Sequence, residues 1–111
     1  KTNSTHSHVI NIRTLDEVSI NYQLKKIDII KIDVEGYEEE VLKGAQQVLT
    51  NHKPIILFES WSTYMKVFQN HVIENFNLLT GYHFYKITRQ GLALLKEGDM
   101  ITSLNLVAIP K

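Results

Sequence analysis

Acidic side chains follow two short apolar runs in this chain. Asp33 and Glu35 come directly after an isoleucine-rich run, Lys31 lies two residues before Asp33, and Glu59 ends the second run. A carboxylate beside a hydroxyl can act as a general base, and hard oxygen ligands suit divalent ions such as magnesium. These four residues are therefore the candidates for acid–base or ion-binding chemistry.

Each candidate also has a structural interpretation. Asp33 could cap the helix that follows, and Glu35 could complement the dipole of that helix, as we expect residues 38–40 to do. Lys31 interrupts an apolar strand, and a buried ammonium is costly unless it is paired. Glu59 on the neighbouring strand is its natural partner. The sequence leaves both interpretations open for each residue.

Composition limits the class of protein. The 111 residues fit one domain, and 43% apolar with 22% charged residues is typical of soluble globular proteins. Twelve basic and twelve acidic residues balance, which argues against nucleic-acid binding. No apolar run approaches the roughly 18 to 20 residues of a membrane span. The chain has no cysteine, which excludes disulfides and thiolate chemistry, and we expect a cytoplasmic protein without nucleic-acid or membrane partners.

The residue pattern alternates strands with helices. A capping box at 14–17 predicts a short helix, and residues 27–33 and 55–59 are typical of buried strands, the first covered on both faces. Apolar residues at three- and four-residue steps over 34–51, Tyr37 among them, predict one helix between these strands. Further expected elements are an extended or strand segment at 9–13, a helix at 61–79, strands at 82–87 and 104–109, and turns around 91–98.

This order of elements predicts an α/β fold. Strands joined through helices favour right-handed crossovers, so we expect a sheet of mostly parallel strands with flanking helices. The last two strands have no helix between them, which predicts an antiparallel C-terminal strand. Residues 1–8 are expected to be a flexible lead-in to the folded part at 9–111.

Several motifs carry a resemblance to a known family. TLDE stands at 14–17, IDIIKIDVEG at 27–36, EVLKGA at 40–45, ILFE at 56–59 and NLVAIP at 105–110. Over nearly everything from residue 9 onward, the chain resembles the FkbM-type methyltransferases. Members of that family are S-adenosylmethionine-dependent O-methyltransferases with a Rossmann-like, class I fold, associated with sugars, polyketides and other secondary or cell-surface metabolites.

The resemblance implies roles for the candidate residues. Asp33 would lie near the methyl-donating end of the cofactor and take the proton of the acceptor hydroxyl, with Glu35 as the second catalytic residue. Lys31 and Glu59 would bind the substrate. The acceptor would be a small molecule or a glycan.

The glycine-rich turn that such a cofactor needs is missing from the sequence. No two glycines are separated by a single residue, so we assign no cofactor-binding residue and interpret 9–111 as the C-terminal half of a methyltransferase, inactive alone. Strand 27–33 would then have one open edge. That edge predicts self-association, as a homodimer or a larger species, or coverage by 9–13 or another segment.

Two other functions stay open at this stage. The missing glycine turn favours a non-catalytic, Rossmann-like module for interaction or substrate recognition. A metal-dependent hydrolase built on Asp33, Glu35 and Glu59 would need a histidine or a further acid nearby. The sequence offers no set of ligands that requires a metal, so no metal site is assigned.

Overall fold

The computed structural model describes residues 7–34, 37–59, 78–96 and 105–111, which form helices and a five-stranded sheet. No helix in these ranges is long and apolar enough to cross a membrane. The expected helix at 61–79 lies largely outside them. The described elements are α1 (Leu15–Asn21), β1 (Ile29–Ile32), α2 (Glu38–Lys43), α3 (Gln46–His52), β2 (Ile55–Glu59), β3 (Tyr82–Thr88), β4 (Gly91–Leu94) and β5 (Asn105–Pro110).

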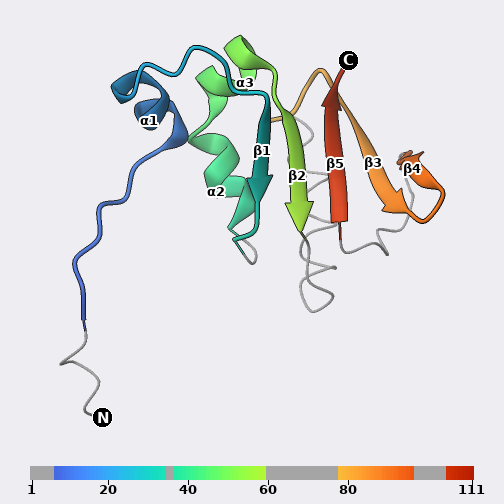
Figure 1. The fold of residues 1–111 in the computed structure, drawn as a ribbon, viewed down its shortest axis with the longest axis horizontal. Coiled ribbons are helices and arrows are strands. Elements are labelled where there is room, and N and C mark those ends of the chain that lie inside the picture. The colour runs from blue at the N-terminus through green and yellow to red at the C-terminus, as the bar shows by residue number, and fades with distance from the viewer. Residues whose placement is uncertain (1–6, 35–36, 60–77, 97–104) are drawn as a thin grey trace.

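The described strands lie in the order β1-β2-β5-β3-β4. The helices gather beside β1 and β2, at the opposite end of the sheet from β4 (Figure 1). β1 and β2 pair in parallel, whereas β2–β5, β5–β3 and β3–β4 are antiparallel. The α/β class and the antiparallel C-terminal strand are therefore confirmed.

The expectation of a mostly parallel sheet is wrong. β5 lies between β2 and β3 and runs against both, so β3 has the direction of β1 and β2 but no parallel neighbour among the described strands. β4 adds a further antiparallel pair where turns were expected, because Gly91, with a φ of 118°, closes a hairpin on β3. The directions in which β3 and β5 run could be predicted from the sequence, but the order of the strands in the sheet could not.

One face of the sheet forms the core with the helices. Ile30, Ile56, Ala108 and Phe84 are aligned across four strands by the pairing register. Alternate residues along a strand point to the same face, so each strand offers a second apolar residue or more to the same side. The buried cluster is Ile32, Leu42, Ala45, Leu49, Ile56, Phe58, Leu79, Tyr82, Phe84, Leu106 and Ala108.

The single helix expected over 34–51 is two helices, α2 and α3, separated at Gly44. A Cβ on Gly44 would lie 3.1 Å from the Thr14 side chain, so the break brings α1 close to the backbone. The Asp16 N–H donates to the Gly44 carbonyl at 3.0 Å. The break therefore serves to dock α1 onto the other two helices.

The segment that leads into β1 is held against the end of α3. The Ile27 N–H donates to His52 Nδ1 at 2.9 Å, and Lys26 Nζ donates to the His52 carbonyl at 3.0 Å. The Ile55 N–H then donates to the Asp28 carbonyl at 2.8 Å and starts the parallel pairing. These contacts set where β1 begins, and hence where its carboxyl end lies.

Two burial expectations for this region are wrong. Ile29 is 59% exposed and Lys31 is exposed, so β1 is covered only on the face of Ile30 and Ile32. Tyr37 was expected in the core and is 65% exposed, because it precedes α2 rather than lying within a helix. Glu38, which was expected only to complement the dipole of the helix, is 6% exposed.

Candidate functional site

The carboxyl ends of β1 and β2 lie side by side at one edge of the sheet. The register pairs Ile32 with Phe58, so the next residues, Asp33 and Glu59, follow at the same edge. Ligands of open α/β sheets bind beyond this edge. The structure therefore brings the backbone positions of two candidate acids together, as the sequence predicted.

Asp33 directly follows β1 and is exposed. The residue that caps α2 is Tyr37, and α2 has no side-chain cap hydrogen bond. Asp33 thus does not serve as the cap of the helix that follows, which was its structural interpretation. Its carboxylate is available to a ligand at the carboxyl edge.

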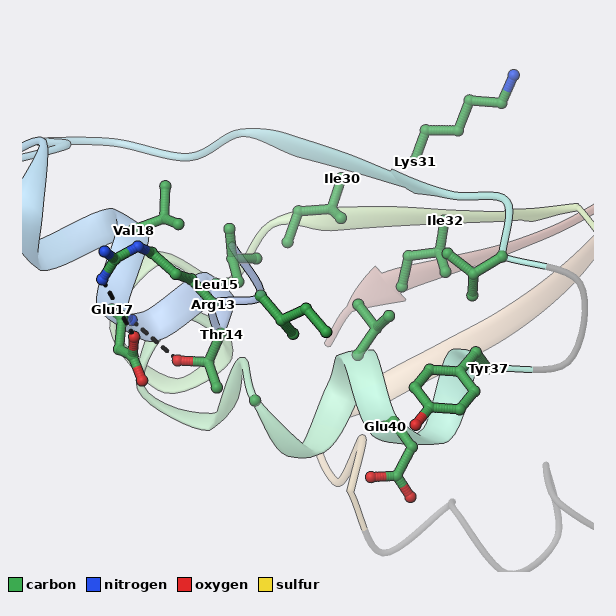
Figure 2. A pocket seen from close by; sticks show the side chains of 14 residues that line it. Arg13, Thr14, Leu15, Glu17, Val18, Ile30, Lys31, Ile32, Tyr37 and Glu40 are labelled. Atoms are coloured by element: carbon green, nitrogen blue, oxygen red, sulfur yellow. Dashed lines mark hydrogen bonds and ion pairs between the residues drawn. The ribbon is translucent and has the colours of Figure 1, made fainter. Parts of the chain in front are cut away.

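Lys31 is not the buried cation that the sequence indicated. Its side chain points away from the helices, on the opposite side of β1 from Ile30 and Ile32 (Figure 2). An exposed ammonium needs no partner to stay charged, so the burial reason for a pair with Glu59 does not apply. Glu35 and the side chain of Glu59 lie outside the described residues.

Two polar residues at this edge were missed by sequence reasoning. Asn105 begins β5 and pairs with Glu59, so it joins Asp33 and Glu59 in a row along the sheet edge. Glu38 lies in the first turn of α2 and shares a helix face with the buried Leu42. The burial of Glu38 could have been found from its spacing, because it stands four residues before the apolar Leu42 and shares its helix face. The place of Asn105 could not, because it depends on the antiparallel pairing of β5 with β2.

The neighbouring acids of α2 have a separate, structural role. Lys43 Nζ lies 3.2 Å from Glu39 Oε1 and 3.6 Å from Glu40 Oε1. The hydrogen bond and charge of Glu39, followed by the charge of Glu40, raise the pKa of Lys43. Glu39 and Lys43 stand four residues apart, the spacing at which side chains of opposite charge pair on a helix.

An open cavity of about 610 Å³ lies along β1 between that strand and the helices α1 and α2. Ile30 and Ile32 point into it from β1, while Arg13 and Tyr37 lie toward its two ends (Figure 2). We call this cavity the β1 groove. It is lined by Ile12, Arg13, Thr14, Leu15, Glu17, Val18, Ile30, Lys31, Ile32, Val34, Tyr37, Glu40, Val41 and Gly44.

Residues that could hold a metal do not gather in the described ranges. No group of three or more His, Cys, Asp or Glu side chains lies within metal-binding reach among them. Glu35 and the Glu59 carboxylate lie outside the described residues and are not covered by this statement. The described geometry therefore assigns no metal ligand.

Comparison with known families identifies the chain. The model of the methyltransferase FkbM domain matches residues 1–85. The chain belongs to the FkbM methyltransferase family. The matched range contains Asp33 and Glu59 of the carboxyl edge but ends before β4 and β5. No curated protein and no solved structure matches this chain.

Membership of the FkbM family implies a methyl donor of the S-adenosylmethionine type. Such a cofactor needs a close backbone approach, which glycines in a strand-to-helix turn provide. Gly81 and Gly91 have positive φ and adjoin strands of the antiparallel half, and Gly44 separates two helices. None of these described glycines follows a strand and opens a helix. The described residues therefore do not by themselves form a place for this cofactor.

Proposed function

We propose that the complete enzyme is an S-adenosylmethionine-dependent O-methyltransferase and that this chain forms the acceptor side of its site. The acceptor would be a hydroxyl of a sugar or a secondary metabolite. Family membership supports methyl transfer. The observation that carries the acceptor role is Asp33, an exposed carboxylate at the carboxyl edge that caps no helix.

The chain's own residues would supply proton transfer and orientation. As the acceptor oxygen becomes a nucleophile, its proton passes to the Asp33 carboxylate, which acts as the general base. Glu35 is proposed as the second catalytic residue, because it follows Asp33 by two positions. An acceptor placed here would also meet the position of Glu59 and, next to it on β5, that of Asn105.

Lys31 and Glu59 are proposed to bind the acceptor. Lys31 is exposed and lies two residues before Asp33, so its ammonium can donate hydrogen bonds to acceptor oxygens from the outer face of β1. Glu59 would accept from acceptor hydroxyls at the end of β2. The cofactor-binding turn would come from a part of the methyltransferase outside residues 9–111.

The substitution Asp33→Asn tests this proposal in a polypeptide that also contains the cofactor-binding part. Loss of the base with little change in shape should lower kcat by ~10²-fold or more. Turnover is followed by transfer of a radiolabelled methyl group to a panel of sugar and polyol acceptors. Binding of the cofactor should stay unchanged.

Asp28→Asn is the matched control, because Asp28 is also exposed and adjoins the same strand at its opposite, amino end. Its carbonyl accepts from Ile55, and the substitution leaves that bond in place. Equal turnover of the two variants would show that Asp33 takes no part in the reaction.

A further inference from the structure

Asn105 lies at the carboxyl edge of β1 and β2 although it begins its own strand. β5 is antiparallel to β2, so it starts where β1 and β2 end (Figure 1). Asn105 pairs with Glu59, the last residue of β2. The pairing of β1 with β2 continues this row to the position of Asp33. Three neighbouring strands thus place three polar residues in one row along the edge where ligands of such sheets bind.

The side chain of Asn105 lies outside the core. Asn105 is exposed, whereas the next residue, Leu106, is 1% exposed and belongs to the buried cluster. Because side chains alternate along a strand, Asn105 is on the opposite face of β5 from Leu106. Its amide is therefore accessible to a ligand at the carboxyl edge.

The polar row ends at β5 in the part of the sheet that the structure describes. The pairing of Lys86 with Leu106 places the next residue of β3, Ile87, beside Asn105, and Ile87 is 42% exposed. Neighbouring strands lie roughly 4.8 Å apart, so the backbone positions of Asp33 and Asn105 are roughly 10 Å apart. A compact acceptor of one or two rings with several hydroxyls fits a row of this length.

The row combines groups that only accept hydrogen bonds with one that also donates. Ionised carboxylates such as those of Asp and Glu accept only, whereas an asparagine amide donates through its NH₂ group and accepts through its carbonyl. A hydroxyl that donates to a carboxylate still has an oxygen lone pair that needs a donor. An acceptor with neighbouring hydroxyls uses every group of this row, and an acceptor with a single hydroxyl does not.

We propose that the acceptor is a carbohydrate and that Asn105 binds a hydroxyl next to the one that is methylated. The assignment rests on the proposed function, in which Asp33 takes the proton of the reacting hydroxyl. The Asn105 amide donates to the neighbouring hydroxyl, which itself donates toward the position of Glu59. Asn105 thereby selects which hydroxyl of a ring reaches Asp33. It is a specificity-determining residue outside residues 1–85, the range that the family model matches.

Acceptors that differ in their hydroxyls test the substrate class in a polypeptide that also contains the cofactor-binding part. The probes are methyl glycosides of common hexoses, with cyclohexanol and phenol as acceptors that carry one hydroxyl. Transfer of a radiolabelled methyl group is measured, and NMR spectroscopy identifies the methylated hydroxyl. We expect at least one glycoside to have a kcat/KM at least ~10-fold above that of cyclohexanol. No transfer to any glycoside, or an equal kcat/KM for cyclohexanol, would overturn the proposal.

Monodeoxy glycosides, each lacking one hydroxyl next to the methylated one, test the role of Asn105. With the wild-type enzyme, one of them should have a KM about 5- to 10-fold above that of the complete glycoside. Asn105→Ala should raise the KM of the complete glycoside by a similar factor with kcat nearly unchanged. It should not raise the KM of that monodeoxy glycoside further, because both changes remove the same hydrogen bond.

Asn51→Ala is the matched control, because Asn51 is exposed in α3, near the amino end of β2. It should leave the KM of every acceptor unchanged, and circular dichroism checks that both variants are folded. The wild-type comparison needs no variant, and equal KM values for the complete and all monodeoxy glycosides would contradict the role of Asn105. Equal effects of Asn105→Ala on all these acceptors would likewise show that the residue acts on the fold alone.

This inference and the proposed function fail in different measurements. A loss of kcat in Asp33→Asn, together with an unchanged acceptor KM in Asn105→Ala, would overturn the role of Asn105 alone. An unchanged kcat in Asp33→Asn would instead overturn the proposed function of the carboxyl edge.

Discussion

Tyr82 carries a buried hydroxyl that joins the beginning of β3 to the beginning of β2. Its O–H donates to the Pro54 carbonyl at 2.8 Å, and the residue is 8% exposed. Burial raises the pKa of the Tyr82 phenol above its ordinary value, because the charged phenolate would lose its solvation. The folded state therefore favours the neutral phenol. This contribution to stability is complete below the ordinary pKa of about 10 and is lost as pH rises through the folded-state pKa.

Tyr82→Phe should lower the free energy of unfolding by about 1 to 3 kcal/mol at neutral pH, since the buried Pro54 carbonyl loses its donor. The variant should also show a smaller fall in stability above about pH 10, because it has no phenol to ionise. Urea unfolding at several pH values measures both effects. Tyr22→Phe is the control, since Tyr22 is 75% exposed. Equal losses in the two variants would contradict a role for the hydroxyl.

Asp33 and Lys31 show how far the candidate site could be predicted residue by residue. The alternation of side chains along a strand correctly placed Lys31 on the opposite face from Ile30 and Ile32. The end of the apolar run correctly placed Asp33 at the edge of the sheet. Whether a face is covered depends on elements distant in sequence. The exposure of Lys31 therefore required the three-dimensional arrangement.

At the scale of elements, Asp16 joins α1 to the beginning of α3. Its two carboxylate oxygens accept from the Gln47 and Val48 N–H groups at 3.0 and 2.9 Å. Ala45, which precedes α3, has no side-chain cap bond. A residue from another helix thus satisfies donors that a local cap normally would.

Asp16→Ala should lower the free energy of unfolding by about 1 to 2 kcal/mol, the upper part of the range for a lost helix cap. Hydrogen exchange at the Gln47 and Val48 amides should become faster, because both lose their acceptor. Asp28→Ala, which replaces an exposed aspartate before β1, is the control for loss of charge. Unchanged exchange at these two amides in Asp16→Ala would show that other groups begin α3.

The elements themselves were largely predictable, but their breaks and their order were not. Thr14 caps α1 by accepting from the Glu17 N–H at 3.1 Å, as the local pattern indicated. Gly44 does not interrupt the three- and four-residue spacing of the apolar residues over 34–51, so this spacing gives no sign of a division into α2 and α3. Only the contact with Thr14 in the folded chain explains the division. The place of β5 between β2 and β3 joins segments that are far apart in the sequence, so local patterns do not indicate it.

At the scale of the whole molecule, the chain combines the edge that we propose to bind the acceptor with an antiparallel extension of the sheet. The parallel pair β1–β2 carries Asp33 and Glu59, whereas β5, β3 and β4 add apolar area to the same core. The family match covers the first part and stops at residue 85, within β3. Strands β5, β3 and β4 complete the core that β1 and β2 share with the helices. None of the described glycines in this part lies in a strand-to-helix turn.

This division predicts that the 111-residue chain alone has no appreciable affinity for S-adenosylmethionine. The sequence has no closely spaced glycines, and the described glycines lie in the hairpin, the turn before β3 and the α2–α3 junction, away from any strand-to-helix turn. Isothermal titration should give a Kd weaker than about 1 mM, which corresponds to less than about 4 kcal/mol of binding free energy. A polypeptide that also contains the cofactor-binding part should bind the same compound in the same titration. A Kd in the low micromolar range for the 111-residue chain would show instead that residues 35–36, 60–77 or 97–104 complete a cofactor site with the carboxyl edge.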